Sequence, residues 1–256
     1  MSKPSIIRAT TLAVGLGAVL ALTASASAST VAGHSGGLRF TNNAHAVGLG
    51  TARATSNRTF AGYEAGVRAG SATVAEASFT VPTLSCTTTD RAIAPGSGVP
   101  ANKGKTVSAA YVFVGCVNGT ATYYPGVVLN GKERDYTTTL FAAGDVVDVT
   151  TKVSTNRTRV QVTDVTTGVT KKKLGSGASA DDAYFGDAAW GSSNGGILHV
   201  PDFTKVTFKS VVIDGKTLAS WRPTAFQRVN SIGRLQISTG GIWPAGNAFS
   251  THFEHS

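Results

Sequence analysis

The sequence predicts an all-β protein built as a two-sheet antiparallel β-sandwich. Short segments rich in Val, Thr, Phe and Tyr alternate apolar with polar residues, which is typical of strands with one solvated face. Turn residues separate these segments at regular intervals, and almost no stretch carries apolar residues at helical spacing. The pattern covers about 190 to 200 residues, enough for one domain with a substantial core.

The first residues have the order of a secretory signal peptide. Lys3 and Arg8 are followed by an apolar run over residues 9–22 and by small residues over 23–28. An apolar run of this length is too short to span a bilayer, so we expect residues 1–28 to be removed on export. The mature protein is expected to be secreted and soluble, with no membrane partner.

Two further regions follow the signal peptide. Residues 29–56 are poor in large apolar side chains and rich in Ala, Gly, Ser and Asn, so we interpret them as a flexible leader or short pro-segment. Residues 57–256 are expected to form the sandwich domain, as a monomer.

The basic residues favour solubility over nucleic-acid binding. The formal net charge is +9, and it falls to about +7 without the two basic residues of the signal peptide. The remaining basic residues are scattered, and their one cluster, Lys171–Lys173, follows a Thr-Thr-Gly turn. No metal-ligand spacing, HExxH helix or phosphate-binding glycine loop occurs, so neither a metal nor a cofactor is expected.

Residues 108–130 are the centre of the predicted fold. Two apolar runs, Tyr111–Val117 and Thr122–Leu129, flank an Asn-Gly pair. Asn-Gly readily adopts the two positive φ angles of a type I′ turn, so the segment predicts a hairpin of two buried strands.

The other predicted strands follow the same reasoning. They are Ala75–Val81, Val146–Val153, Arg159–Val165, Leu198–Val200, Val206–Ile213, Thr217–Trp221, Leu235–Ser238 and Ala248–Phe253. Residues 94–104 and 174–195 are rich in small and turn-forming residues and are predicted to be loops. The second loop is the expected place of function, because long loops at the end of a sandwich often carry binding residues.

Cys86 and Cys116 are the only cysteines. Two cysteines in an exported chain most often pair, so we expect a disulfide between the segment after the first strand and the central hairpin. The alternative is a reactive thiol with a histidine partner, but no Cys-His signature surrounds either residue.

Seven short motifs occur in the order found in the glutamic peptidases, or eqolisins, and together they resemble that family from about residue 57 to 253. Thr59–Tyr63 is similar to the family's Asn-Trp-Ala/Ser-Gly-Tyr, residues 77–83 to its strand ending in Val-Pro-Thr, and Phe113–Gly115 with the later Asn-Gly to its Trp-Val-Gly-Ile-Asp-Gly. The other motifs are Ala143–Val147, Asp164–Gly168, Val200–Phe208 and Ala248–Phe253. The resemblance implies a concanavalin A-like jelly roll and a secreted acid endopeptidase.

The resemblance also implies where catalytic residues would lie. The family uses a glutamine amide to support the oxyanion and a glutamate as general base and then acid. The glutamine position falls at or next to Tyr124. In one register the family's two glutamates become Ala183 and Asp187; one residue later they become Tyr184 and Ala188. Asp187 is therefore the candidate base and Tyr124 the candidate donor.

Because neither the glutamine nor a glutamate is kept, the sequence favours a non-catalytic or weakly catalytic relative. It would bind a peptide, protein or polysaccharide in a groove lined by aromatic side chains, for which the candidates are Phe113, Tyr123, Tyr124, Tyr184 and Trp190. One alternative is an acid endopeptidase that uses Asp187 and Tyr124. Another is a carbohydrate-binding or carbohydrate-active sandwich, in which Glu133 or Asp135 would face Asp187.

Overall fold

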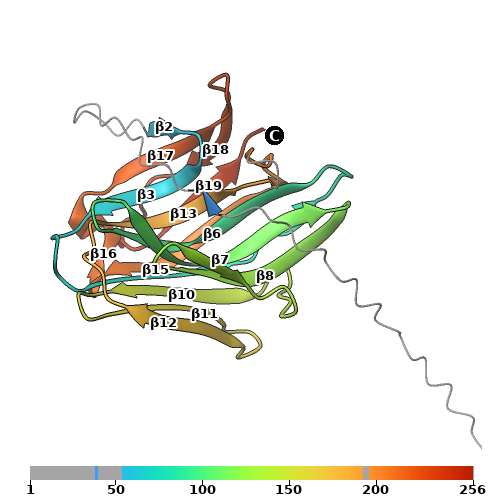
Figure 1. The fold of residues 1–256 in the computed structure, drawn as a ribbon. Coiled ribbons are helices and arrows are strands. Elements are labelled where there is room, and N and C mark those ends of the chain that lie inside the picture. The colour runs from blue at the N-terminus through green and yellow to red at the C-terminus, as the bar shows by residue number, and fades with distance from the viewer. Residues whose placement is uncertain (1–37, 40–53, 193–195, 256) are drawn as a thin grey trace, which may run out of the picture. The chain divides into compact units, whose positions relative to one another are not determined.

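The computed structural model describes residues 38–39, 54–192 and 196–255, and nearly all of the regular structure in these ranges is β-strand. Figure 1 labels most of the elements. They are β1 (Leu38–Arg39), β2 (Thr55–Asn57), β3 (Phe60–Gly66), β4 (Thr73–Thr80), β5 (Leu84–Ser85), β6 (Arg91–Ala101), β7 (Thr106–Val117), β8 (Thr120–Leu129), β9 (Lys132–Asp135), β10 (Val146–Val153), β11 (Arg157–Asp164), β12 (Thr170–Ser176), β13 (Asp182–Trp190), β14 (Asp202–Phe203), β15 (Lys205–Ile213), β16 (Lys216–Thr217), the 3₁₀ helix η1 (Leu218–Trp221), β17 (Thr224–Val229), β18 (Leu235–Thr239) and β19 (Phe249–Phe253).

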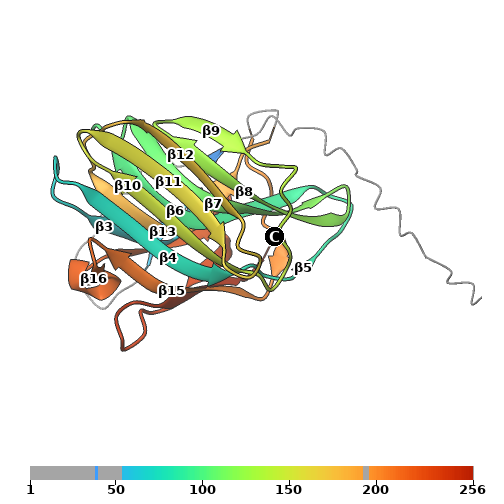
Figure 2. The same cartoon turned by 90° about the horizontal axis from the view of Figure 1, so that it is seen from below.

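Most strands belong to one continuous sheet that folds over on itself (Figures 1 and 2). Its order runs β9-β8-β7-β6-β13-β3-β17-β18-β19-β15-β4-β10-β11-β12, and every pairing in this order is antiparallel. The turnover lies at β17, β18 and β19, so the strands on either side of it form two layers. Strands β10 and β11 of the second layer pack against β7 and β8 of the first.

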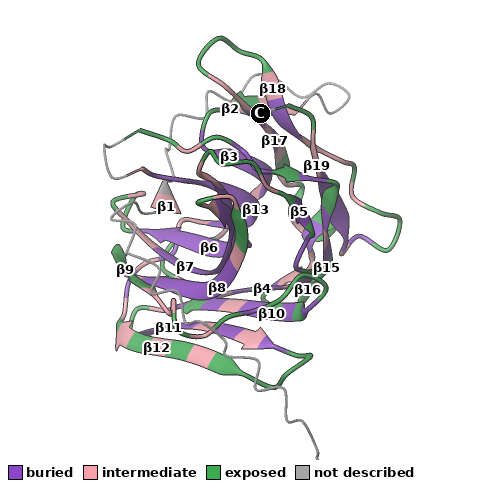
Figure 3. Cartoon of the chain, turned by 90° about the vertical axis from the view of Figure 1, so that its right-hand side faces the viewer, coloured by how far each residue is buried: buried purple, intermediate pink, exposed green. Residues whose placement is uncertain are grey.

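Aromatic rings link the two layers through the core. Phe79 of β4 lies 5.4 Å from Phe208 of β15, measured between ring centroids. Phe208 stacks on Phe249 at 4.8 Å, and Phe249 meets Tyr63 of β3 edge-on at 4.8 Å. Such ring contacts add about 0.5–1.5 kcal/mol each beyond the apolar area that they bury. Figure 3 shows that strands of both layers are largely buried where they face this interior.

This architecture confirms the predicted all-β sandwich and its central hairpin. Strands β7 and β8 pair from Ala109 opposite Val128 to Val117 opposite Thr120. The connecting Asn-Gly pair has φ angles of 50° and 77°, both in the left-handed region that a type I′ turn requires.

Both segments predicted to be loops contain strands instead. Residues 94–104 fall mostly in β6 and residues 174–195 contain β13, and these two strands pair with each other. Their small residues serve close packing rather than a turn, since an added Cβ on Gly96 would lie 2.3 Å from the Ala110 carbonyl oxygen. Pro95 fits within the sheet because it has no partner in the register of β6 with β7.

Two predicted strands are also wrong. Of the predicted strand Thr217–Trp221, the last four residues form the 3₁₀ helix η1. Leu218 is fully buried there and the two residues after it are exposed, so the burial does not alternate as in a strand. Leu198–Val200 contributes an isolated bridge, His199 with Arg91, rather than a strand.

The disulfide between Cys86 and Cys116 is confirmed and ties the segment after β5 to β7. The expected signal peptide and most of the expected leader lie outside the described residues. Within the described ranges, no helix has the length and apolar character needed to cross a membrane.

Removing the disulfide is expected to lower the free energy of unfolding by about 2–4 kcal/mol, because it closes a loop between cysteines 30 residues apart. The measurement is denaturant unfolding of the wild type and of the C86A/C116A variant, each with and without dithiothreitol. The reductant should shift the wild-type midpoint and leave the variant unchanged. A wild-type midpoint that ignores the reductant would contradict this prediction.

Candidate functional site

Strand β13 presents alternate side chains to two environments. Ala183 and Phe185 lie in the core between the two layers, whereas Ala188 and Trp190 lie on the opposite face of the sheet. This division follows from the pleat of a β-strand, in which successive side chains point to opposite faces. Strand β7 is divided in the same way.

Four aromatic side chains from β7, β8 and β13 gather on the face opposite the core. Phe113 stacks on Tyr124 with ring centroids 4.4 Å apart and planes within 3°. Trp190 meets Phe113 at 4.9 Å and Tyr111 at 5.6 Å, both edge-on. We call these four residues the aromatic face. None is more than 4% exposed, so the rings are packed together rather than open to solvent.

Glycines allow two of these rings to lie close to the sheet. A Cβ added to Gly126 would lie 2.3 Å from the Tyr111 ring, and one added to Gly115 would lie 2.5 Å from the Phe113 ring. A larger residue at either position would therefore displace a ring.

A narrow crevice runs beside the aromatic face. Tyr184 lies 5.5 Å from Phe60, and these two rings border a crevice whose lining includes Tyr111 and whose volume is only about 10 Å³. Small residues of β6, β7 and β13 line it on the sheet side, namely Ala94, Gly96, Gly98, Ala109, Gly186 and Ala188. Small residues therefore form the floor of the crevice, and aromatic rings border it.

Strand β1 lies against the same face, next to β6 and β13 (Figure 3). Leu38 pairs with Trp190, and its side chain packs against the aromatic face and lines the crevice. The backbone N–H of Leu38 donates a 3.1 Å hydrogen bond to Oε1 of Glu133 on β9. A short extended segment of the chain thus contacts both β13 and β9.

Two carboxylates of β9 meet at one phenol. The Tyr111 hydroxyl lies 2.7 Å from Oε1 of Glu133 and 2.8 Å from Oδ1 of Asp135, so these oxygens are no more than 5.5 Å apart, the sum of the two distances. A phenol has one proton to donate. Both contacts are hydrogen bonds only when one carboxyl is protonated and donates to the phenol oxygen.

The environment of Asp135 favours this shared proton. Burial raises the pKa of Asp135 to about 6, opposed by the hydrogen bond from Tyr111 and reinforced by the charge of Glu133. The pKa of Tyr124 is also raised, first by burial and then by these two carboxylates. At mildly acidic pH Asp135 therefore holds its proton and can donate it to the Tyr111 phenol oxygen.

Asp187 lies in a different environment. It is fully buried, its Oδ2 accepts a hydrogen bond from the Thr251 hydroxyl of β19, and its Oδ1 has no hydrogen-bond partner. Burial raises the pKa of Asp187 to about 7, although Thr251 and the charge of Arg228 lower it. Asp187 is therefore a core carboxyl rather than a group of the aromatic face.

The structure brings together some of the residues singled out from the sequence. Phe113, Tyr124 and Trp190 are in contact on the aromatic face. Tyr184 lies on the same side of the sheet, beside Phe60.

The structure separates the others. Tyr123 points into the core between the layers, and Asp187 bonds to Thr251, so Asp187 does not face Tyr124. Two alignments with the family's glutamates were possible. In the alignment that places them at Tyr184 and Ala188, both positions lie on the side of the sheet that carries the aromatic face. Neither of those residues is a carboxylate.

Sequence reasoning missed three features of this face. Tyr111 was not singled out, although its spacing of two from Phe113 on one strand places both on one face. Glu133 and Asp135 were considered as partners of Asp187, but they face the Tyr111 phenol instead. Nothing local in the sequence indicates that Leu38 lies on this face.

Metal ligands do not gather in the part of the chain that is described. No group of three or more His, Cys, Asp or Glu side chains there is arranged to hold a metal ion.

Comparison with solved structures shows the fold class to which this chain is similar. No protein-family model matches the sequence, and no curated protein matches it. Scytalido-glutamic peptidase with a peptide-based transition-state analogue superposes with a TM-score of 0.63 at 17% identity, over 77% of this chain and 98% of that one.

Two further structures agree. SCP-B, a member of the eqolisin family of peptidases in complex with the tripeptide Ala-Ile-His, gives a TM-score of 0.61 at 17% identity, over 77% of this chain and 98% of that one. Aspergilloglutamic peptidase from Aspergillus niger gives 0.54 at 17% identity, over 64% of this chain and 99% of that one. The chain therefore has the β-sandwich fold of the eqolisins.

Asp187 is expected to make the protein more stable in acid. Its pKa is about 7 in the folded state against an ordinary value of 3.8, so the folded state retains a proton that the unfolded state releases. The stabilisation is full below about pH 4 and is lost as the pH rises through about 7, with a slope of up to about 1.4 kcal/mol per pH unit.

Urea unfolding of the wild type and of Asp187→Asn between about pH 4 and 8 measures this effect. The variant should lose part of the slope and keep the part from Asp135 and Glu64, whose pKa values are raised to about 6 and about 7. Identical pH profiles for the two proteins would show that Asp187 does not titrate in this way.

Proposed function

We propose that the protein is an exported, monomeric peptide-binding protein with the fold of a glutamic peptidase and with little or no peptidase activity. Its ligand is an extended peptide with an apolar side chain, held on the aromatic face and along the adjoining crevice. The acidic residues Glu133 and Asp135 border this site and contact the peptide backbone.

Strand β1 is the observation that carries the proposal. Leu38 places an apolar side chain on the aromatic face, its backbone pairs with β13, and its N–H donates to Glu133. Proteins that bind extended peptides use the same contacts, in which main-chain bonds give affinity and side-chain pockets give specificity. The chain's own segment therefore indicates which ligand the face accepts.

A peptide suits this face better than a polysaccharide. A sugar ring would need an accessible aromatic surface for stacking, but Phe113 and Tyr124 are stacked on each other. Trp190 is fully buried. This face instead already accommodates an extended segment, because Leu38 of β1 packs against it and lines the crevice.

The low activity follows from the residues on this face. Tyr124 occupies the position of the family's glutamine, and a phenol does not reproduce the geometry of an amide. Losing one oxyanion donor lowers catalytic rates by about two to three orders of magnitude, and losing the general base lowers them further. Asp187 does not restore the base, since it bonds to Thr251 within the core.

One observation favours a second candidate, an acid endopeptidase with a different reacting pair. Glu133 and Asp135 meet at the Tyr111 phenol, and the raised pKa of Asp135 lets one carboxyl be protonated while the other is ionised. This is the state in which one group serves as acid and the other as base. The contact of Glu133 with the Leu38 N–H places a peptide backbone beside this pair.

A synthetic peptide with the sequence of residues 34–41, His-Ser-Gly-Gly-Leu-Arg-Phe-Thr, is expected to bind the protein. Binding should be at least severalfold tighter to Leu38→Asp than to the wild type, because the aspartate no longer competes for the aromatic face. Fluorescence anisotropy of the labelled peptide measures both affinities.

Matched controls make this experiment decisive. The same peptide with aspartate in place of its leucine should not bind. Glu133→Gln should weaken binding of the leucine peptide severalfold, whereas Lys132→Gln, at an exposed position on the same strand, should not. Equal affinity for the two peptides would rule out recognition through the aromatic face.

The second candidate predicts cleavage of denatured casein between about pH 3 and 6, where Asp135 is protonated. Glu133→Gln and Asp135→Asn should each lower the rate at least a hundredfold, while Asp187→Asn remains active. If the wild type cleaves nothing across this range, or if both β9 variants cleave normally, the second candidate is excluded.

A further inference from the structure

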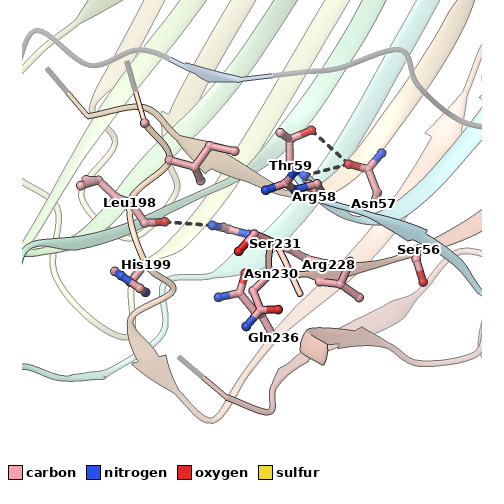
Figure 4. Close-up of a pocket in the computed structure, with 13 residues that line it drawn as sticks. Ser56, Asn57, Arg58, Thr59, Leu198, His199, Arg228, Asn230, Ser231 and Gln236 are labelled. Carbon is pink, nitrogen blue, oxygen red and sulfur yellow. Dashed lines mark hydrogen bonds between the residues drawn. The ribbon is translucent and has the colours of Figure 1, made fainter. Parts of the chain in front are cut away.

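A second cavity is lined by residues of β2 and β17, among others, and by no residue of β9; Figure 4 shows its lining. It has a volume of about 750 Å³, and its lining includes Asn57, Arg58, His199, Arg228, Asn230 and Gln236. This volume falls within the range of about 300–1,000 Å³ that is typical of small-molecule sites.

Arg228 is a buried residue of this cavity with hydrogen-bond donors that are not used. It is 1% exposed, and its Nη2 donates a 2.9 Å hydrogen bond to the Leu198 carbonyl oxygen. Figure 4 shows this contact, with the side chain extending among the lining residues. Its Nε and Nη1 have no hydrogen-bond partner. A buried guanidinium is normally paired with an anion, because burying an unpaired charge is costly.

Asp187 meets this need only in part. One of its carboxylate oxygens bonds to Thr251 and the other has no partner, so Asp187 and Arg228 form no hydrogen bond with each other. Burial lowers the pKa of Arg228 to about 10, although the charge of Asp187 raises it. Arg228 therefore remains a cation at neutral and acidic pH, with two donor groups unused.

The charge of the lining favours an anion. Arg58 joins Arg228 in the wall, and the described residues that line the cavity include no Asp or Glu. A positively charged concave site without carboxylates concentrates anionic ligands.

The side-chain amides add donors to this site. The Asn57 Oδ1 accepts hydrogen bonds from the backbone N–H and hydroxyl of Thr59. The Asn230 Oδ1 accepts the backbone N–H groups of Ile232 and Arg234. Because both amide oxygens are engaged, the NH₂ groups are what these two side chains offer to a ligand.

We propose that this cavity binds a carboxylate, with Arg228 as its charge partner and with Arg58, Asn57 and Asn230 as further donors. A planar guanidinium matches the two oxygens of a carboxylate through parallel N–H bonds, which favours this anion over a spherical one. A free organic acid and an acidic side chain of a peptide both supply this group. The site is separate from peptide binding at the aromatic face.

Isothermal titration calorimetry at one fixed pH in Bis-Tris buffer tests the proposal with two probes, succinate and the blocked peptide acetyl-Gly-Glu-Gly-amide. At least one probe is expected to bind the wild type, and the matching Gln peptide is not. The double variant Asp187→Asn/Arg228→Gln removes both buried charges together and should lower affinity at least tenfold. Ser231→Trp, at an exposed position in the lining, should block entry by a similar factor.

The two probes separate the sources of the carboxylate. Binding of succinate alone identifies a free acid, binding of the Glu peptide alone identifies an acidic side chain, and binding of both shows a site for either. If thermal unfolding shows that the double variant is not folded, Ser231→Trp decides the outcome. The proposal is overturned if neither probe binds or if inorganic phosphate binds as tightly as the better probe. It is also overturned if Arg58→Gln abolishes binding while the folded Asp187→Asn/Arg228→Gln and Ser231→Trp variants keep the wild-type affinity.

Discussion

The alternation of side chains along the central strands β13, β7 and β8 is the constraint on which this structure depends. Both faces of these strands are covered, one by the second layer of the sheet and the other by rings that pack on each other. The pleat therefore assigns each buried residue of these strands to one of two environments. A shift of one residue would exchange Trp190 with a position in the core and move Asp187 onto the aromatic face.

The same constraint explains what the sequence could and could not predict. Alternating Val and Thr residues identify the strands of the second layer, where one face is solvated, and the Asn-Gly pair identifies the central hairpin. Strands β6 and β13 were not recognised, because small residues and prolines at buried positions resemble the composition of loops. Gly96 is small because the Ala110 carbonyl oxygen lies against it, a contact that no local pattern reveals.

The candidate site was predictable to the extent that it lies on the central hairpin. Phe113 and Tyr124 stack across the hairpin pairing, as residues opposite each other on one face do. The role of Asp187 was not predictable, since it depends on which face β13 turns toward β19. The approach of β9 to Tyr111, and of Leu38 to both, depends on the folding of the whole sheet.

The buried carboxyl groups give the molecule a common response to pH. The pKa values of Glu64, Asp135 and Asp187 are all raised chiefly by burial, so each group holds its proton to higher pH in the folded state than in the unfolded one. These three groups therefore stabilise the folded state more in mild acid than at neutral pH. These groups lie both in the core, where Asp187 accepts a hydrogen bond from Thr251, and beside the aromatic face, where Asp135 meets Tyr111.

The most direct test of this account is a crystal structure of Leu38→Asp with the leucine peptide of residues 34–41 bound. The account predicts that the peptide leucine lies on the aromatic face against Trp190, that its backbone contacts Glu133, and that Asp187 keeps its bond to Thr251. A peptide bound elsewhere on the molecule, or a carboxylate of Asp187 turned toward the peptide, would contradict it.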